Sequence, residues 1–281
     1  MIPTLLPLTA LIRGSLAFAN VSHTEDSMER CGAPDPSREQ MEAAQLLGGQ
    51  HLNTTDRFQA GTVTINTYFH IVASSENEEE GYLSDKAVDD QLRVLNEDYA
   101  GSGFNFTLAN TTRTVNPTWA TSSSSEPIES EMKAALRQGT YSDLNLYFLT
   151  SLGDVLGYCY FPVASPSERD LSRDGCSILA STVPGGSAQG FNLGRTATHE
   201  VGHWLGLFHT FQGGCDDQDK VEDTPAQNGP SRGCPIGRDS CPGGGPDPIH
   251  NYMDYSDDSC LEEFTPGQQA RMRSSWEAYR A

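Results

Sequence analysis

Basic residues and long apolar runs are both scarce in this sequence. No run of apolar residues approaches the ~18 that a membrane-spanning helix needs, so we expect no membrane partner. Lys and Arg number 18 against 38 Asp and Glu in 281 residues, which gives a formal net charge of -20. The phosphates of nucleic acid would repel such a chain, so we expect no nucleic-acid partner either. The mean hydropathy of -0.48 is typical of a soluble globular protein, which we expect to be a monomer.

The first residues are typical of an export signal. Residues 5–12 are apolar, and Ala17-Phe18-Ala19 fits the small-x-small rule for signal cleavage. The fit is imperfect, because the only positive charge before the apolar stretch is the amino terminus, and Arg13 lies just after it. The alternative is a buried first strand or helix. Export agrees with the seven cysteines and with four N-glycosylation sequons, which begin at Asn20, Asn53, Asn105 and Asn110. We therefore predict a signal peptide over 1–19 and a secreted, extracellular protein.

The next part of the chain divides into a polar lead and an alternating region. Residues 20–57 are polar with one short amphipathic stretch at 41–47, and they predict a propeptide or a flexible lead. From 58 onward strands and helices alternate, which predicts an α/β arrangement of a twisted sheet with helices packed on it. Strands are predicted where β-branched and aromatic residues gather, at 62–72, 104–108, 144–149, 156–161 and 176–181. Helical spacing predicts helices at 84–99 and 129–137.

The texture changes after residue 206. Residues 211–248 are dense in Gly, Pro, Asp and Cys, and apolar burial alone would not order so long a loop, so something else should pin it. Thr265-Pro266-Gly267-Gln268 is a capping box with Pro at the first helical position, which predicts a terminal helix to about 279. We expect a catalytic domain over 58–281 in two parts, 58–206 and 207–281.

The strongest chemical signal is the sequence His-Glu-Val-Gly-His-Trp-Leu-Gly-Leu-Phe-His at 199–209. On a helix, His199 and His203 lie one turn apart on the same face and can bind one metal ion. Gly206 allows the chain to leave the helix sharply, which can bring His209 back to that ion. Three neutral imidazoles leave a fourth position for water, which indicates a catalytic rather than a structural zinc site.

Glu200 is the candidate general base of this site. It lies about 100° round the helix from His199, beside the metal without binding it. From there it can accept a proton from the zinc-activated water and pass it to the leaving amine. Ala197, Val201 and Leu205 form an apolar stripe on the opposite face that would anchor the helix to the sheet. The alternative is a helix that merely carries surface histidines.

These residues resemble a known family. His-Glu-x-x-His-x-x-Gly-x-x-His is the metzincin signature, and residues 250–255 resemble the methionine turn of that clan. The sequences at 192–196, 223–225 and 251–260 resemble the pappalysin family, in particular its short secreted fungal and microbial metalloproteases. The resemblance is strong over 190–266 and looser from about 61. It implies a metzincin-type domain of mixed α+β or α/β class, with a mostly parallel sheet that has an antiparallel edge strand, and an irregular disulfide-stapled C-terminal part that ends in a helix.

The resemblance also assigns roles and an activity. Met253 would form the hydrophobic floor beneath the zinc, and Tyr255 would stabilise the oxyanion of the tetrahedral intermediate. For Tyr255 the alternative is a core tyrosine with a satisfied hydroxyl. The strand at 156–161 matches the family's edge strand, to which an extended peptide can add, so we expect a zinc endopeptidase acting on proteins or peptides. Asp257 and Asp258 lie in the stretch that walls the family's primed-side pocket and could favour basic side chains there.

The cysteines separate into six in the expected catalytic domain and one outside it. Sequence alone allows fifteen pairings of six cysteines. The family pattern suggests Cys215–Cys241 and Cys234–Cys260, which leaves Cys159–Cys176. The seventh, Cys31 in Arg30-Cys31-Gly32, resembles the cysteine switch in the propeptides of some metzincins, where a thiolate fills the fourth zinc position and keeps a zymogen silent. The alternative is an unpaired or intermolecular cysteine in a disordered lead.

Calcium and two other functions stay open at this point. A structural calcium could be held by the acidic residues after the motif, although a solvated acidic loop explains them equally: Asp216, Asp217, Asp219, Glu222 and Asp223. A secreted zinc-binding adhesin or scaffold without turnover would predict the loss of Glu200 or of a ligand, and neither is lost. A zinc hydrolase for non-peptide substrates is disfavoured by the edge strand.

Overall fold

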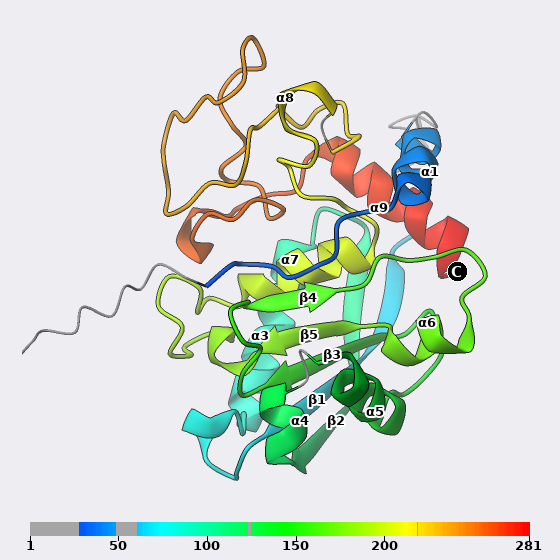
Figure 1. Cartoon of the computed structure of the whole chain (residues 1–281), viewed down its shortest axis with the longest axis vertical. Helices are drawn as coiled ribbons and strands as arrows, with labels where there is room; N and C mark the ends of the chain where they lie inside the picture. Colours follow the sequence, from blue (N-terminus) through cyan, green and yellow to red (C-terminus); the bar gives the residue numbers. More distant parts are fainter. Residues whose placement is uncertain (1–27, 49–60, 123–124, 218) are drawn as a thin grey trace, which may run out of the picture.

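The computed structural model describes residues 28–48, 61–122, 125–217 and 219–281. The predicted signal peptide and the sequons at Asn20 and Asn53 therefore lie outside the described residues. Figure 1 shows a sheet flanked by helices in one half of the molecule and irregular loops in the other, with helix α7 between them. No helix in the described ranges has the length and apolarity that crossing a membrane requires.

The first half is built on one five-stranded sheet in the order β2-β1-β3-β5-β4. Neighbouring strands are parallel except at the edge, where β4 runs antiparallel to β5. This confirms the mostly parallel sheet with an antiparallel edge strand. The strands are β1 (Val63–Ala73), β2 (Phe104–Val115), β3 (Leu144–Leu149), β4 (Gly157–Cys159) and β5 (Cys176–Leu179).

Strand β2 is longer than the predicted 104–108. Its second half is polar, yet it continues to pair with β1 as far as the Ala73–Val115 pair. Strand β2 is the outer strand, so one of its edges pairs with no other strand and much of its surface faces solvent. Polar threonines are therefore compatible with the strand at these positions. The sequon residues Asn105 and Asn110 are both exposed on this strand.

The helices follow the predicted pattern with additions. Ser84 caps α3 by accepting a hydrogen bond from the Ala87 amide, and the Thr265–Gln268 capping box opens α9 as predicted. Helices α4 and α6 were not predicted, because six residues are too few to establish a periodicity. The helices are α1 (Arg38–Gly48), α3 (Asp85–Asp98), α4 (Pro117–Ser122), α5 (Glu126–Leu136), α6 (Glu168–Arg173), α7 (Arg195–Trp204), α8 (Gly214–Asp217) and α9 (Pro266–Tyr279).

A large apolar core lies between the sheet and helix α7. Phe69 and Phe148 on neighbouring strands pack with ring centroids 5.1 Å apart, and both are fully buried. Helix α7 places Ala197, Val201 and Leu205 in the same core, which confirms the apolar stripe expected opposite the histidines. The face of α7 that carries the histidines therefore points away from this core.

The second half is ordered by covalent and polar links rather than by strands. Disulfides join Cys215 to Cys241 and Cys234 to Cys260, while Cys159–Cys176 ties β4 to β5; these are the pairs that the family resemblance implies. Buried amides add a second set of links. The side chains of Asn251 and Gln268 exchange hydrogen bonds of 2.7 and 2.9 Å, which fix the methionine-turn region to the start of α9.

Candidate metal centre

Two glycines set the limits of the helix that carries the site. Gly194 precedes α7 and Gly206 follows it, with φ of 88° and 90°, a region that residues with a side chain rarely occupy. A Cβ on Gly206 would also lie 2.4 Å from the Ser275 Oγ. The turn at Gly206 reverses the chain and returns His209 to the face of α7 that bears His199 and His203.

The three histidine side chains converge on one point, which we call the metal point. The Nε2 of His203 lies 3.2 Å from that of His199 and 3.0 Å from that of His209. For comparison, two ligands at 2.0–2.1 Å on a tetrahedral zinc are about 3.3 Å apart. The opposite ring nitrogens of two of them donate to backbone carbonyls, His199 Nδ1 to Tyr252 O at 2.6 Å and His203 Nδ1 to Leu207 O at 2.8 Å.

This arrangement fits a metal ion and little else. Burial lowers the pKa of all three histidines, that of His203 to about 4, so the rings are neutral. With Nδ1 of His199 and of His203 holding a proton, the Nε2 atoms of these two rings present lone pairs to one another. Close lone pairs in a buried site repel each other unless a cation lies among them. The donor set is therefore that of a metal centre.

Glu200 lies beside this point and is fully buried. Its Oε2 accepts a hydrogen bond from the Cys31 Sγ at 3.4 Å, and its Oε1 has no hydrogen-bond partner. Burial raises the pKa of Glu200 to about 8. Gly157 at the start of β4 packs so closely that a Cβ there would lie 2.9 Å from the Glu200 Cγ, so a glycine is needed for the sheet edge to approach the carboxylate.

Met253 and Tyr255 come to the site from the irregular half. Met253 packs beneath α7, where a Cβ on Gly202 would lie 2.4 Å from its sulfur. The hydroxyl of Tyr255 lies 3.2 Å from the His209 Nε2 and donates to the carbonyl of Cys31 at 3.1 Å. The tyrosine hydroxyl is thus at the metal point itself, while Met253 contributes its apolar side chain to the floor.

Cys31 fills the remaining side of the metal point. Its Sγ and the nearest ring nitrogens of the three histidines all lie within 4.8 Å of one another. The segment around it is bound to the sheet edge as an added strand: Glu29 N donates to Asp154 O, Leu156 N to Glu29 O and Gly32 N to Gly157 O, at 2.8 to 3.0 Å. Cys31 is therefore buried in an ordered segment.

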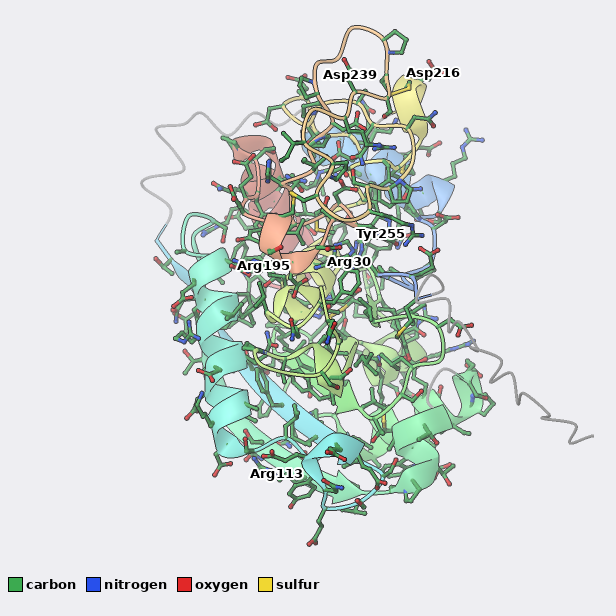
Figure 2. The ribbon with its side chains drawn as sticks, turned by 90° about the vertical axis from the view of Figure 1, so that its left-hand side faces the viewer. Arg30, Arg113, Arg195, Asp216, Asp239 and Tyr255 are labelled. Carbon is green, nitrogen blue, oxygen red and sulfur yellow. A yellow bond between two sulfur atoms is a disulfide. The ribbon has the colours of Figure 1, made fainter. Side chains whose placement is uncertain are left out.

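Arg30, next to Cys31, enters a closed pocket. Its guanidinium pairs with Asp258 at 2.5 Å and donates to the carbonyl of Ser256 at 3.0 Å, with the ring of Phe191 5.3 Å away. Arg30 is 1% exposed and Asp258 is fully buried. Figure 2 shows Arg30 and Tyr255 between the irregular loops and the sheet. Asp258, rather than the half-buried Asp257, makes this contact.

Asp98 is a supporting residue that sequence reasoning missed. At the end of α3 its carboxylate accepts hydrogen bonds from Thr198 Oγ1 at 2.7 Å and from the Tyr252 hydroxyl at 2.9 Å. Thr198 precedes the first histidine, and the carbonyl of Tyr252 orients the same ring. Asp98 therefore ties helix α7 to the methionine turn. No motif marks it, since an acidic residue at a helix end usually faces solvent.

The acidic residues after the motif take separate positions. Asp223 caps α9, accepting hydrogen bonds from Thr265 Oγ1 and from the Gly267 amide. Asp219 is buried, with one carboxylate oxygen bonded to the Val221 amide at 3.0 Å and the other without a hydrogen-bond partner. Among the described residues, these acids form no group of three within 4.8 Å of one another.

The segment over the metal point is held as an extended peptide, with backbone hydrogen bonds to the sheet edge. A fold that binds a peptide backbone against a metal ion and a buried carboxylate is that of a metallopeptidase. The family described as "Pregnancy-associated plasma protein-A", peptidase family M43, matches residues 186–277. An extracellular metalloprotease of Coccidioides posadasii (strain C735) is 53% identical over 278 residues, which cover 98% of each chain.

A second extracellular metalloprotease, from Pyricularia oryzae (strain 70-15), is 57% identical over 275 residues and 95% of each chain. The chain belongs to this pappalysin family of peptidases. The extracellular location and the zinc metalloendopeptidase activity predicted from the sequence are thereby confirmed.

Two solved structures share the fold. Mature mirolysin of Tannerella forsythia, in complex with a cleaved peptide, has a TM-score of 0.64 at 30% identity and covers 76% of this chain and 91% of its own. A promirolysin mutant from the same organism has a TM-score of 0.67 at 27% identity, and covers 89% of this chain and 95% of its own. The expected metzincin-type fold is confirmed.

Proposed function

We propose that this protein is made as a latent precursor and, once processed, cuts internal peptide bonds on the amino side of Arg or Lys. The observation that carries the proposal is the buried Arg30–Asp258 pair beside the metal point. Its substrates are proteins or peptides. The enzyme is a monomer, and neither nucleic acid nor a membrane is its partner. The chain divides into a signal peptide over 1–19, a propeptide over 20–57 and a catalytic domain over 58–281.

One zinc ion is held by His199, His203 and His209. When bound, zinc supplies Lewis acidity that lowers the pKa of a water molecule to about 7. Glu200 accepts the proton of the attacking water and later delivers it to the leaving amine. The Tyr255 hydroxyl donates to the oxygen on which negative charge develops. Met253 supports the site from below without taking part. The 3.0 to 3.2 Å spacing of the histidine nitrogens supports this assignment.

Latency follows from what Cys31 occupies. Its sulfur takes the side of the metal point that water needs, and its thiol engages the Glu200 carboxylate. Both groups that the chemistry requires are thus blocked by one side chain. The promirolysin structure covers 89% of this chain and the mature mirolysin structure 76%, which supports the presence of a pro-segment in this chain.

The basic specificity follows from what Arg30 occupies. A guanidinium buried against a carboxylate and a carbonyl forms short, charge-assisted hydrogen bonds that a neutral side chain cannot replace. With Cys31 at the metal point, the neighbouring pocket is where a substrate residue adjacent to the cut would lie. A calcium ion could also bind in the irregular half and stabilise its loops. The carboxylate oxygen of buried Asp219 that has no hydrogen-bond partner supports this proposal.

The first test is digestion of casein by the purified mature enzyme and by Glu200→Ala, with zinc quantified in both. We expect about one zinc in each protein and cleavage only by the wild type. Equal cleavage by the two proteins would show that Glu200 is not the base. A precursor carrying Cys31→Ser should be active without processing, whereas one carrying Ser37→Ala should stay as silent as the wild type.

The second test is a peptide-library digest that identifies the residue after each cut. We expect Arg and Lys there, and an Asp258→Asn enzyme that cuts these sites about 30-fold more slowly while the matched Asp257→Asn enzyme behaves as wild type. A library profile without basic residues after the cut contradicts the assignment of the pocket.

A further inference from the structure

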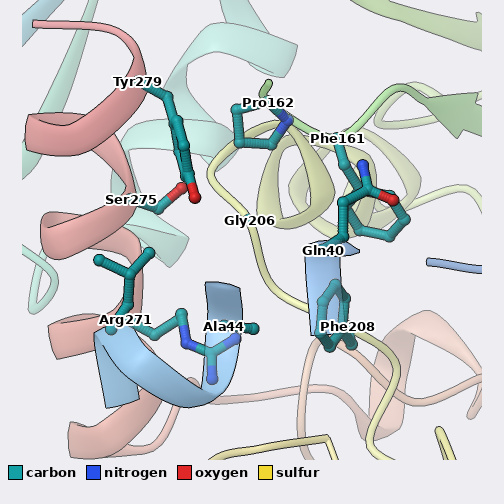
Figure 3. A pocket seen from close by; sticks show the side chains of 10 residues that line it. Gln40, Ala44, Phe161, Pro162, Gly206, Phe208, Arg271, Ser275 and Tyr279 are labelled. Atoms are coloured by element: carbon teal, nitrogen blue, oxygen red, sulfur yellow. The ribbon is translucent and has the colours of Figure 1, made fainter. Parts of the chain in front are cut away.

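Helix α1, which follows Cys31 and the loop after it, lies in a groove beside the metal centre. We call this the α1 groove and define it by Phe161, Pro162, Gly206, Phe208, Arg271 and Ser275. Figure 3 shows α1 over this groove, with Gln40 near Phe161 and the guanidinium of Arg271 reaching toward Ala44. The rings of Phe161 and Phe208 are 5.2 Å apart, and Ala44 packs against them with 5% exposure.

The α1 groove borders the metal centre just after strand β4. Its wall residue Phe161 lies two positions after strand β4, and its ring meets that of His203 edge-on at 5.3 Å. Along the pro-segment, Arg30 comes before Cys31 and α1 comes after it. A substrate with a basic residue in the Asp258 pocket after the cut must therefore send the residues before the cut toward the α1 groove.

The α1 groove contains polar groups that α1 does not satisfy. Arg271 is 3% exposed, and only its Nη2 has a hydrogen-bond partner, the carbonyl of Lys220 at 2.6 Å. Its Nε and Nη1 have no partner, nor does the hydroxyl of Ser275, which is 2% exposed. The space left beneath α1 is about 30 Å³, room for about one water molecule. Burial lowers the pKa of Arg271, and the nearby charge of Asp219 opposes that shift.

We propose that removal of the pro-segment turns the α1 groove into a substrate-binding site for the residues before the cut. It takes an apolar side chain against Phe161 and Phe208, and an acidic side chain on Arg271. The apolar part replaces the contacts that Met41 and Ala44 of α1 make now. The acidic part gives one of the two free guanidinium nitrogens the charged hydrogen-bond partner that α1 lacks. This inference rests on the proposed cleavage before basic residues.

The α1 groove would therefore make the enzyme selective on both sides of the cut. Helix α1 is then an imperfect occupant, which covers the apolar walls while leaving the guanidinium donors unmatched. A buried donor without a partner weakens binding of the helix, so the pro-segment can leave once its chain is cleaved.

The test uses synthetic peptides and the mature enzyme. All peptides have Arg after the cut and an apolar residue before it, and Glu is compared with Gln at each position from the second to the sixth before the cut. We expect one position at which the Glu peptide has about a tenfold higher kcat/KM. Replacing the apolar residues nearest the cut with Ser should lower kcat/KM by about tenfold as well.

Variants assign the effect to the α1 groove. Arg271→Met should reduce the Glu-to-Gln ratio to near one. Arg273→Met, on the same helix and paired with Glu277, should keep the wild-type ratio. The wild-type ratios decide the matter whether or not Arg271→Met folds. Equal rates for Glu and Gln at every position overturn the inference, and failure to cut any Arg peptide overturns the proposed function and this inference with it.

Discussion

The two halves of the molecule are ordered by different forces. Residues 61–206 form a sheet and helices around a large apolar core. Residues 207–265 contain little regular structure; they add Leu207, Tyr252, Met253, Leu261 and Phe264 to that core and depend in addition on two disulfides and buried hydrogen bonds. Apolar burial depends on periodic sequence patterns, while a disulfide needs only that two cysteines meet. The same molecule thus contains one region that periodicity can predict and one that it cannot.

The metal centre lies where the two regions meet and takes different groups from each. Helix α7, anchored on the sheet, supplies His199, His203 and Glu200, whose positions relative to one another are set by helix geometry. The irregular region supplies His209, which the turn at Gly206 returns to the site, and Tyr255, which reaches the site because the methionine turn is fixed. Four predictions, from the largest expected effect to the smallest, test this division.

Phe148→Ala should have the largest effect on stability. Its ring is fully buried against Phe69 in the centre of the sheet, so truncation leaves a cavity that costs about 4 kcal/mol. The measurement is urea unfolding of the precursor, which retains α1, for the variant and for the wild type. The exposed Leu46 on α1, changed to Ala, is the matched control and should alter stability little. A loss below about 1 kcal/mol for Phe148→Ala would mean that the sheet does not depend on this core.

The two halves should respond to pH in opposite directions. Burial lowers the pKa of His70, on β1, to about 4 from 6.5, so the unfolded chain binds the extra proton between these values. Stability from His70 is therefore lost as the pH falls below about 6.5, by up to about 3 kcal/mol. Burial raises the pKa of Asp219, in the irregular half, to about 7 from 3.8, so its folded form keeps a proton that the unfolded form has released.

Stability should accordingly fall as the pH rises from about 4 to 7 because of Asp219, by up to about 4 kcal/mol. Unfolding measured across this range in wild type, His70→Gln and Asp219→Asn separates the two slopes. Asp219→Asn should remove the loss at rising pH, and His70→Gln the loss at falling pH. Calcium chloride should remove the Asp219 slope in the wild type if that carboxylate binds calcium, and leave it unchanged otherwise.

Removing Cys215–Cys241 should mainly affect the irregular half. The bond closes a separation of 26 residues, for which a loss of about 3 kcal/mol is expected when both cysteines become Ala. The loops of the variant should become accessible to a protease before the sheet does. The order in which the proteolytic fragments appear measures this. Removing Cys159–Cys176, which ties β4 to β5, serves as the comparison in the sheet. Simultaneous exposure of both halves would show that they do not unfold separately.

Much of the first half could be predicted because its apolar residues recur at the spacing of the strand or helix that contains them. The strand at β1 and the Ser84 cap of α3 are local properties of the sequence, and so is the spacing of His199 and His203. The length of β2 could not be predicted, since its polar half is decided by its place at the outer edge of the sheet. The contact between Arg30 and Asp258 could not be predicted either, because 228 residues separate them and no local pattern relates two positions so far apart.

Asp98→Asn tests the smallest link, the one that joins the two halves behind the metal. Its carboxylate accepts hydrogen bonds from Thr198 on α7 and from Tyr252 of the methionine turn, whose carbonyl orients His199. An asparagine amide has only one acceptor oxygen, so it can accept one of these two hydrogen bonds and loses the other. The His199 ring therefore loses part of its support. We expect zinc affinity about tenfold weaker, measured by competition with a chelator, and a lower kcat with KM little changed. Asp89→Asn, exposed on the same helix, should bind zinc as the wild type does. Wild-type zinc affinity in Asp98→Asn would mean that the two halves hold His199 without this link, and that the disulfides and the Asn251–Gln268 hydrogen bonds suffice to place the methionine turn.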